Sequence, residues 1–426
     1  MVKPGYKQSE VGIIPEDWGV TTLRAAFPKL EAGVSVNSDN MTSSQFHVLK
    51  TSAVHNGIFD PAEIKPVIKA DYSRLKCPLV QGSIIISRMN TPTLVGECGY
   101  VKNAPADVYL PDRLWQIQNP KDSAYNFEWL NYLLNTKQYR DAVRATATGT
   151  SNSMKNISKE RLMEVEIPWL SLDEQNRISV ALSDIDALIV NLEKLIAKKK
   201  DIKQGAMQEL LTGRRRLPGF SGQWTEYALS NFVECIRGVN YDGSADLNQF
   251  ETAETVRLLR SNNIKNARFV DADVQYVYRN KVKLSQYLCV DDIMVCMANG
   301  SRSLVGKSCY FEKPFIGDYT FGAFMSCIRK KDSDTNMYYI FNLMNSDSYW
   351  NQIAILFSGS SINNLRPTDI LNMRFLFPLP NEQTAICEVI QDMESEILDL
   401  EGKLCKYQRI MLGMMSELLT GRIRLL

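Results

Sequence analysis

The chain has 426 residues, 45% hydrophobic and 23% charged, with a formal net charge of +1, which is ordinary for a globular protein with two or three cores. It holds no run of about 18 apolar residues, so we expect no membrane span. The balanced charge neither favours nor excludes a nucleic-acid partner, because binding depends on clustering of charge on one face.

The N-terminus, MVKPGYKQSE, is polar and has no apolar core of a secretory signal. The nine cysteines include no CxxC pair, and their number is odd. We therefore expect reduced, packed thiols and a cytoplasmic location.

Residues 1–170 are predicted to form a first globular domain of mixed α/β structure. Val48–Lys50 and Gly82–Ser87 are short apolar runs typical of buried strands, and Asn126–Asn135 has a helical pattern. A turn-forming cluster, Gly149–Ser153, lies near the end of this domain.

Residues 171–217 are predicted to form a first long helix. Its apolar residues alternate steps of four and three, as in a coiled coil: Ile178, Leu182, Ile185, Ile189, Leu192 and Ile196. Lys199 and Lys203 interrupt the seam, which favours a specified partner or register, and Gly213 has the position of a C-terminal cap.

Residues 218–380 are predicted to form a second mixed domain, weakly similar to the first. LLRSNNIKNARF at 258–269 aligns with VLKTSAVHNGIF at 48–59, and Leu304-Val305-Gly306 aligns with Leu94-Val95-Gly96. Val256–Arg260 and Asp292–Met297 have strand patterns, Met337–Asn345 has a helical one, and Ser358–Asn364 is a turn cluster.

Residues 381–426 are predicted to form a second long helix that repeats the first. ELLTGRIRL at 417–425 repeats ELLTGRRRL at 209–217, and 19 of 44 positions are identical between Glu174–Leu217 and Glu382–Leu425. Its heptad seam is Ile386, Ile390, Met393, Ile397, Leu400, Leu404, Tyr407, Met411, Met414 and Leu418.

The internal duplication predicts an α+β fold of pseudo-two-fold symmetry, in which two mixed domains alternate with two long helices. Because a domain must fit between the helices, we expect them to pair as an antiparallel coiled coil. The domains have diverged far more than the helices, which indicates that a constant partner docks on the helices and a variable one on the domains.

Patterns for catalytic sites are missing. The only histidines, His47 and His55, have no ligand partners at metal-site spacing, and GxSxG and GxGxxG motifs are absent. GSRSLVGKS at 300–308 has five residues between its glycines where a P-loop needs four. We therefore expect a non-catalytic protein without its own cofactor or metal, in which Cys98 and Cys309 are packed thiols.

These segments together resemble the specificity subunit of Type I restriction–modification systems over essentially the whole chain. The resemblance is carried by SEVGIIPEDW at 9–18, LVGECGYV at 94–101, YLPDRLWQI at 109–117, GTSNSMKNIS at 149–158, IPWLSLDEQNRI at 167–178, KKKDIKQGAMQELLTGRRRLPGFSGQW at 198–224, DDIMVCMANGSRSLVG at 291–306 and the terminal ELLTGRIRLL.

The resemblance implies a prokaryotic protein whose two target-recognition domains each bind one half of a gapped double-stranded DNA site. It implies that the helices set the spacing and hold two methyltransferase subunits, and that two restriction (motor-nuclease) subunits join the complex. Adenine would be methylated at N6 after it is flipped out of the duplex. S-adenosylmethionine and ATP would belong to these partners.

DNA reading requires cations for phosphates and amide or guanidinium groups for base edges. The candidates lie in predicted loops, with Arg88 and Arg302 favoured because each follows a buried strand; Asn and Ser also favour turns for their own reasons. In the first domain they are Lys50, Ser52, Arg88, Asn90, Thr91, Arg113, Ser151, Asn152 and Lys155; in the second they are Arg260, Asn262, Asn263, Asn299, Ser301, Arg302, Asn363 and Asn364.

Two other interpretations remain open from the sequence. A stand-alone DNA-binding regulator would use the same domains without a methyltransferase. A nuclease would cleave DNA with magnesium alone, although nuclease-type acidic clusters are missing.

Overall fold

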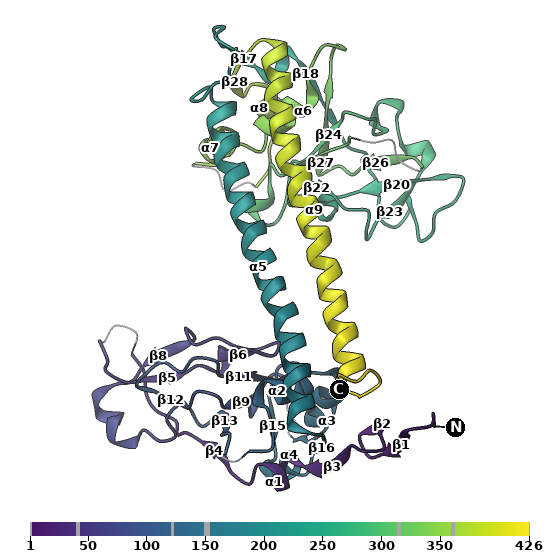
Figure 1. Cartoon of the computed structure of the whole chain (residues 1–426). Helices are drawn as coiled ribbons and strands as arrows, with labels where there is room; N and C mark the ends of the chain where they lie inside the picture. The colour runs from purple at the N-terminus through teal and green to yellow at the C-terminus, as the bar shows by residue number, and fades with distance from the viewer. Residues whose placement is uncertain are drawn as a thin grey trace. The chain divides into compact units, whose positions relative to one another are not determined.

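The computed structural model describes residues 2–39, 43–120, 123–148, 154–312, 317–358 and 363–425. Two mixed domains alternate along the chain with two long helices, α5 (Leu172–Leu211) and α9 (Pro380–Leu418), in an α+β fold (Figure 1). Two compact units are present: residues 1–193 with 402–426, and residues 194–401. Each unit thus holds one mixed domain and part of both helices; the division of the sequence at 170, 217 and 380 stays a prediction.

The first unit is built around a four-stranded antiparallel sheet. Its order is β11 (Cys98–Tyr100), β9 (Ile84–Ser87), β13 (Leu114–Ile117) and β4 (Leu30–Ala32). A second sheet has the order β12 (Val108–Tyr109), β5 (His47–Leu49) and β8 (Ile64–Pro66), and a small one has β10 (Met89–Asn90), β15 (Lys155–Ile157) and β14 (Ala147–Thr148). The remaining strands pair as β1 (Tyr6–Ser9) with β2 (Gly12–Pro15), β3 (Gly19–Thr22) with β16 (Glu166–Trp169), and β6 (Val54–His55) with β7 (Ile58–Phe59).

The second unit repeats this plan. Its main sheet has the order β18 (Val233–Arg237), β27 (Met325–Lys330), β24 (Ile293–Cys296) and β25 (Ser308–Tyr310). A second sheet has β19 (Leu247–Asn248), β23 (Gln275–Tyr278), β20 (Thr255–Leu259) and β26 (Tyr319–Phe321). The remaining strands pair as β17 (Thr225–Ala228) with β28 (Arg374–Phe377), and β21 (Ile264–Lys265) with β22 (Arg268–Phe269).

Short helices complete both domains, and their first turns explain where they begin. Asn126 accepts a hydrogen bond from the Trp129 amide at 2.9 Å to cap α2 (Phe127–Leu134), and Asn336 accepts one from Tyr339 at 3.0 Å to cap α6 (Met337–Leu343). The others are α1 (Leu23–Ala26), α3 (Lys137–Ala145), α4 (Lys159–Met163), α7 (Asp347–Phe357) and α8 (Pro367–Leu371). The helices predicted at 126–135 and 337–345 are confirmed.

Strands β9 and β24 are buried at every position because both of their faces are covered. Ile84 and Ile86 of β9 enter the core beneath the long helices, whereas Ile85 enters a second core against the β5 sheet. In β24, Ile293 and Val295 likewise enter the core beneath the long helices, whereas Met294 and Cys296 enter a second core. The strands expected from these continuous apolar runs are confirmed.

Within each unit, segments of α5 and α9 pack together. In the first unit, Ile178 and Leu182 of α5 share a core with Met411 and Leu418 of α9. In the second, Met207 and Leu210 of α5 share a core with Ile386 and Ile390 of α9. The start of α5 therefore meets the end of α9, and the reverse, as antiparallel pairing requires.

The seam lysines have carboxylate partners on α9 within the second unit. Lys199 lies 2.6 Å from Glu396, Lys203 lies 2.5 Å from Glu394, and Lys200 lies 2.7 Å from Glu401. The interruption of the heptad at Lys199 and Lys203 thus fixes the partner and register of this helix pair.

Each domain is joined to the helices by what we call a Trp–Glu–Arg cluster. In the first unit, Trp18 donates to Glu174 at 3.2 Å, and Arg424 pairs with Glu174 at 2.5 Å. In the second, Trp224 donates to Glu382 at 3.2 Å, and Arg216 pairs with Glu382 at 2.5 Å. Both clusters combine the beginning of one long helix with the tail that follows the other.

Among the helices of the described residues, none combines the length and apolar character that crossing a membrane requires.

Candidate nucleic-acid interface

The exits of the central strands β9 and β24 are held in the same backbone frame. After β9, the Arg88 amide donates to the Arg113 carbonyl at 2.9 Å, and the Ile157 amide donates to the Arg88 carbonyl at 3.0 Å. After β24, the Met297 amide donates to the Phe324 carbonyl at 2.8 Å, and the Leu365 amide donates to the Met297 carbonyl at 2.7 Å. In both domains, three segments therefore meet at one place: the residue that follows the central strand, a turn, and a later segment of the domain.

We call these meeting points the first and second loop clusters. The first comprises residues 88–93, 112–113 and 155–156; the second comprises residues 297–303, 323–324 and 363–364. The structure brings the candidates Arg88, Asn90, Arg113 and Lys155 together in the first cluster, and Asn299, Ser301, Asn363 and Asn364 together in the second. Whether they touch DNA stays a prediction.

In the first loop cluster, Arg88 is half-buried and oriented by its neighbours. Its guanidinium lies 5.5 Å from the ring centre of buried Trp115, and its Nε donates to Asn156 Oδ1 at 3.2 Å. Asn90 pairs in register with Lys155, while Arg113 lies exposed. This arrangement presents three cationic side chains and two amides at one end of the sheet.

The second loop cluster is built from amides and hydroxyls. Asn299 Nδ2 donates to Ser261 Oγ at 3.1 Å, and Asn363 Nδ2 donates to the Gly300 carbonyl at 3.3 Å. Asn364 is exposed and forms a β-bridge with Ala298. Arg302 is the only cationic residue within this cluster as defined.

Asn90 and Asn299 occupy equivalent places. Each accepts a backbone hydrogen bond at 2.9 Å in the loop that follows, from Thr91 and Ser301 respectively. The next hydroxyl pairs also match: Thr91 Oγ1 lies 3.2 Å from Thr93 Oγ1, and Ser301 Oγ lies 3.0 Å from Ser303 Oγ. The loops share a frame although their sequences differ.

Lys50 and Ser52 are engaged elsewhere. Lys50 Nζ lies 3.5 Å from Glu63, and the Ser52 hydroxyl donates to the same carboxylate. The Ser52 hydrogen bond and the charge of Lys50 hold the pKa of Glu63 below its usual value. Both side chains are bound to Glu63, which is not part of the first loop cluster, and their contact with DNA stays a prediction.

Arg260 and Asn262 share a partner next to the second loop cluster. Arg260 donates to Asp273 Oδ2 at 3.1 Å, and Asn262 donates to it at 2.8 Å. Asn263 has no exposed surface, and its amide donates to the carbonyls of Val270 and Ala272 at 3.0 and 2.9 Å. The predicted DNA contact of Asn263 disagrees with this burial; its amide closes the loop instead.

Arg302, a favoured candidate, lies against the end of α7. Its guanidinium donates to the Phe357 carbonyl and lies 4.9 Å from the Phe357 ring centre. Arg302 begins a 3-10 turn, Arg302–Leu304. The residue that makes the backbone hydrogen bonds equivalent to those of Arg88 is Met297, so Arg302 is not the equivalent of Arg88. Ser151 and Asn152 lie outside the described residues.

Two residues of these clusters escaped the sequence analysis. Asn156 orients Arg88, and the available signal was its place in GTSNSMKNIS at 149–158, one of the segments that carry the family resemblance. Phe324 was not singled out because it stands in an apolar run, Phe321–Met325, that gives no sign of which residue is exposed. Its side chain is 72% exposed.

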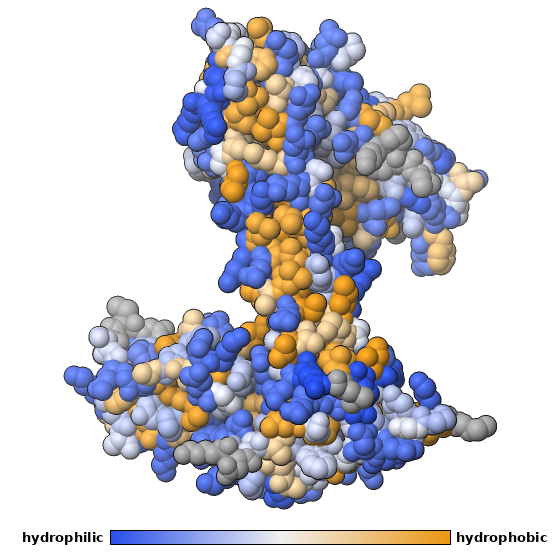
Figure 2. All heavy atoms as spheres, viewed as in Figure 1, coloured by the Kyte–Doolittle hydropathy of each residue, from blue (hydrophilic) through white to orange (hydrophobic). Residues whose placement is uncertain are grey.

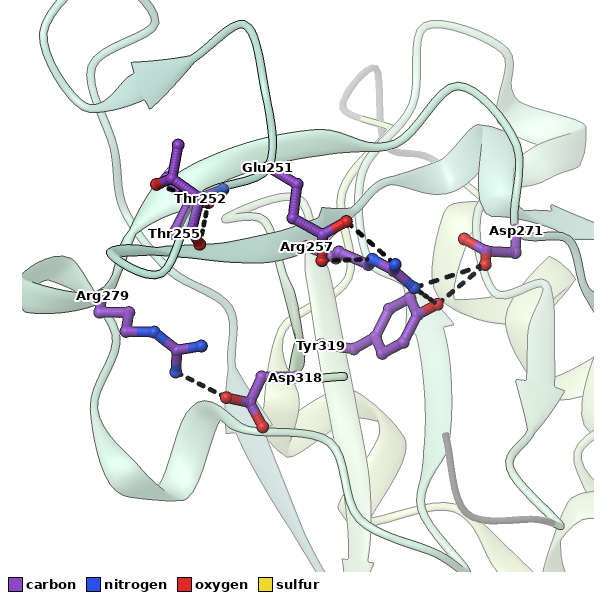
Figure 3. Close-up of polar contacts among 8 residues, drawn as sticks. All are labelled: Glu251, Thr252, Thr255, Arg257, Asp271, Arg279, Asp318 and Tyr319. Carbon is purple, nitrogen blue, oxygen red and sulfur yellow. Dashed lines mark hydrogen bonds and ion pairs between the residues drawn. The ribbon is translucent and has the colours of Figure 1, made fainter. Parts of the chain in front are cut away.

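A charged network fixes strand β26, which leads into the second loop cluster. Arg257 on β20 pairs with Glu251 at 3.0 Å and donates to the Tyr319 hydroxyl at 2.5 Å, and Tyr319 donates to Asp271 at 2.8 Å (Figure 3). Arg279 pairs with Asp318 at 2.6 Å. Hydrogen bonds from Arg257 to Glu251 and Tyr319 raise its pKa. Because Arg257 is paired with carboxylates, we infer that it stabilises the second loop cluster through β26 and does not itself contact DNA.

Exposed apolar side chains lie along the long helices, and Figure 2 shows apolar surface there. On α5 they are Leu172, Val180, Val190, Leu195 and Ile202, and on α9 they are Leu398, Ile410 and Leu412. In the first unit, a groove of about 1070 Å³ runs between α2 and the long helices, and Tyr132, Asp186 and Leu412 are among its lining residues.

Five cysteines, including Cys98 and Cys309, are buried as packed thiols, whereas Cys289 and Cys405 are exposed. Burial raises the pKa of Cys98 to about 12, and it raises the pKa of Cys309 as well. In the described part of the chain, no three His, Cys, Asp or Glu side chains form a group able to hold a metal ion.

Comparison with known proteins identifies one family. Residues 15–204 match the family described as the Type I restriction modification DNA specificity domain. The Type I restriction enzyme StySPI specificity subunit of Salmonella potsdam is 33% identical over 193 residues, 44% of this chain and 40% of that protein. The EcoKI specificity subunit of Escherichia coli K12 is 30% identical over 204 residues, 47% of this chain and 42% of that protein. The alignments thus span less than half of these relatives.

Similarity of fold extends further. The crystal structure of a Type I restriction-modification system S subunit from M. genitalium has a TM-score of 0.57 at 16% identity, covering 94% of this chain and 96% of that one. A structure of a type I R-M system, reported for its complex assembly and conformational transition, has a TM-score of 0.56 at 14% identity, covering 96% and 99%. These structures share the fold of the whole chain.

Proposed function

We propose that this chain, as a member of the Type I restriction–modification specificity-subunit family, reads DNA with both of its mixed domains, each at one half of a two-part site. The observation that carries this proposal is the pair of loop clusters. Their backbone frame is the same, with equivalent asparagines at 90 and 299, but their other side chains differ. A constant frame with variable side chains suits two readers of different sequences.

The chemistry of the loops fits double-stranded DNA. Asn90, Asn299, Asn363 and Asn364 carry amides, which pair with adenine edges in the major groove, and Arg88 and Arg113 carry guanidiniums, which pair with guanine or phosphate. Lys155 supplies a further charge for the backbone. Arg88 is held by Trp115 and Asn156, so a bound base edge would meet a preoriented group.

The long helices are proposed to set the spacing of the half-sites and to dock two methyltransferase subunits. Support comes from their exposed apolar residues and from the constancy of their sequence between repeats. Two restriction subunits would join through the methyltransferases. The chain itself would perform no chemistry: S-adenosylmethionine and ATP would be bound by those partners, and the product would be adenine methylated at N6 in a prokaryotic cytoplasm.

The decisive experiment is single-molecule methylome sequencing of a host with and without this gene, the methyltransferase being present in both. We expect a gapped, two-part, adenine-methylated motif to disappear with the gene. An unchanged methylome would contradict the proposal and favour a stand-alone regulator, for which binding-site selection on the isolated chain is the next measurement. DNA cleavage by the purified chain with magnesium would instead indicate an enzyme.

A further inference from the structure

Phe324 is an exposed aromatic residue in a tightly held turn. The Met325 amide donates to the Gly322 carbonyl at 2.8 Å, so Ala323 and Phe324 occupy the corners. The flanking residues, Phe321 and Met325, are 0% and 1% exposed, whereas Phe324 is 72% exposed. The turn therefore directs one ring outward from a chain segment that is otherwise core.

The backbone of this turn is anchored on both sides. The Phe324 carbonyl accepts hydrogen bonds from the amides of Met297 at 2.8 Å and Ala298 at 3.2 Å. On the other side, a Cβ at Gly238 would lie 2.0 Å from the Gly322 carbonyl oxygen, so only glycine permits this approach. The position of Phe324 is therefore set by the sheet.

The ring lies within the second loop cluster. Phe324 is bonded through its carbonyl to the segment that carries Asn299, and the Asn299 amide donates to the Asn363 carbonyl at 3.4 Å. Single exposed apolar residues are common on protein surfaces and need no explanation by themselves. Phe324, however, is held by backbone hydrogen bonds and lies among amides proposed to read DNA, so it is a candidate for contact with DNA.

The first domain has the same turn with different corners. The Leu114 amide donates to the Pro111 carbonyl at 3.5 Å, and the Arg113 carbonyl accepts from Arg88 as that of Phe324 accepts from Met297. Asp112 and Arg113 thus stand where Ala323 and Phe324 stand in the second domain. The guanidinium of Arg113 in the first domain therefore corresponds to the phenyl ring of Phe324 in the second.

A phenyl ring forms no hydrogen bond with a phosphate or a base edge, but it can touch the methyl group of thymine or stack on the face of a base. Such stacking requires a base that has lost a neighbour, through a kinked step or through a flipped nucleotide. We propose that Phe324 stacks on an unstacked base of the second half-site, while Arg113 makes a charged contact at the equivalent place of the first. This inference rests on the proposed function of the loop clusters.

Binding measurements test the nature of the contact. The complex of this chain with its methyltransferase is titrated with its gapped duplex over a series of salt concentrations. Phe324→Ala should weaken binding roughly five- to 150-fold, the range for stacking one base, without changing the salt dependence. Arg113→Ala should instead reduce the slope of log K against log salt by about 1 if it contacts a phosphate.

Phe250 provides the matched control because it is 70% exposed in the same domain and lies outside the second loop cluster. Phe250→Ala should bind as the wild type does, and Phe324→Trp should restore the affinity lost in Phe324→Ala. Thermal melts should be alike, since both rings are exposed. Equal affinity of Phe324→Ala and the wild type would overturn the inference.

The stacked base is located with 2-aminopurine placed at successive positions of the second half-site. In the wild-type complex, one position should change its fluorescence, and Phe324→Ala should alter the signal at that position while Phe250→Ala preserves it. If Phe324→Ala instead weakens assembly with the methyltransferase, and the complexes that still form keep the wild-type fluorescence, the ring is a protein contact and the inference is wrong.

The two proposals fail in different ways. If the wild-type complex does not prefer duplexes with an intact second half-site over scrambled ones, the proposed reading of DNA fails. If the wild type discriminates and the Phe324 variants match it in affinity and fluorescence, only the stacking contact fails.

Discussion

Asp186 and Glu394 occupy the same position in the repeated long helix, yet only Glu394 has a cationic neighbour. Glu394 accepts from Tyr338 at 2.7 Å and lies 2.5 Å from Lys203. Asp186 accepts from Tyr132 at 2.7 Å, and buried Met411 takes the repeat position of Lys203. Burial raises the pKa of Asp186 above 3.8, and only the Tyr132 hydrogen bond opposes the shift.

This difference predicts a pH-dependent contribution to stability. Because the folded-state pKa of Asp186 is raised, its protonated form is favoured by folding; the contribution is fully present below pH 3.8 and is lost as pH rises through the raised value. Asp186→Asn should therefore unfold at equal or higher urea than the wild type at pH 7, and this advantage should shrink toward pH 4. Asp184→Asn, exposed on the same helix, is the control. A difference independent of pH would contradict the explanation.

At the scale of elements, the Trp–Glu–Arg clusters attach each domain to the ends of both long helices. Glu174 and Glu382 are 4% and 2% exposed, and each meets an arginine that follows the other helix. Arg424 also lies 5.7 Å from the Trp18 ring centre, and Arg216 lies 5.4 Å from that of Trp224. The residues that follow α9 thus help to hold the first domain in its unit.

Removal of Arg424 should destabilise the first unit. Arg424→Ala leaves the buried Glu174 carboxylate without its cation, and breaking a buried pair in this way costs about 3 kcal/mol. Arg422→Ala removes an exposed pair with Glu417 at 3.5 Å and should cost less than about 1 kcal/mol. Urea unfolding of the full chain, followed by tryptophan fluorescence, compares the two. Equal midpoints would show that the cluster does not stabilise the unit.

At the scale of the whole molecule, α5 and α9 are continuous helices that belong partly to one unit and partly to the other. A helix has a fixed rise of about 1.5 Å per residue, so a change of length has a calculable effect. If the helices set the spacing of the half-sites, as we propose, their length is encoded in the gap of the DNA motif.

Insertion of four residues after Glu193, with four more after Glu401, tests this relation. The insertions add about 6 Å to each helix, and at ~3.4 Å per base pair the methylated motif should gain one or two base pairs in its gap. Insertion in α5 alone is the comparison, because it shifts one helix against the register set by Lys203 and Glu394. Methylome sequencing gives the result. An unchanged gap in the double insertion would refute a spacing role.

Local pattern in the sequence determined the elements and their duplication. The heptad seam predicted α5 and α9 because helical periodicity is a property of neighbouring residues, and Gly213 and Gly421 have positive φ of 71° and 70° just after them. The apolar runs at 84–86 and 293–296 predicted strands buried on both faces. Asn90, Arg113 and Lys155 were predicted as site residues only because they lie in loops expected from the sequence.

Only the tertiary structure decided which partners these loop side chains have. Asn263 is buried, Lys50 pairs with Glu63, and Arg302 caps α7, while Phe324 is exposed from an apolar run. The reason is physical: burial and ion pairing depend on partners tens to hundreds of residues away, which local periodicity does not encode. The same reason explains Arg424, whose partner Glu174 belongs to the other repeat.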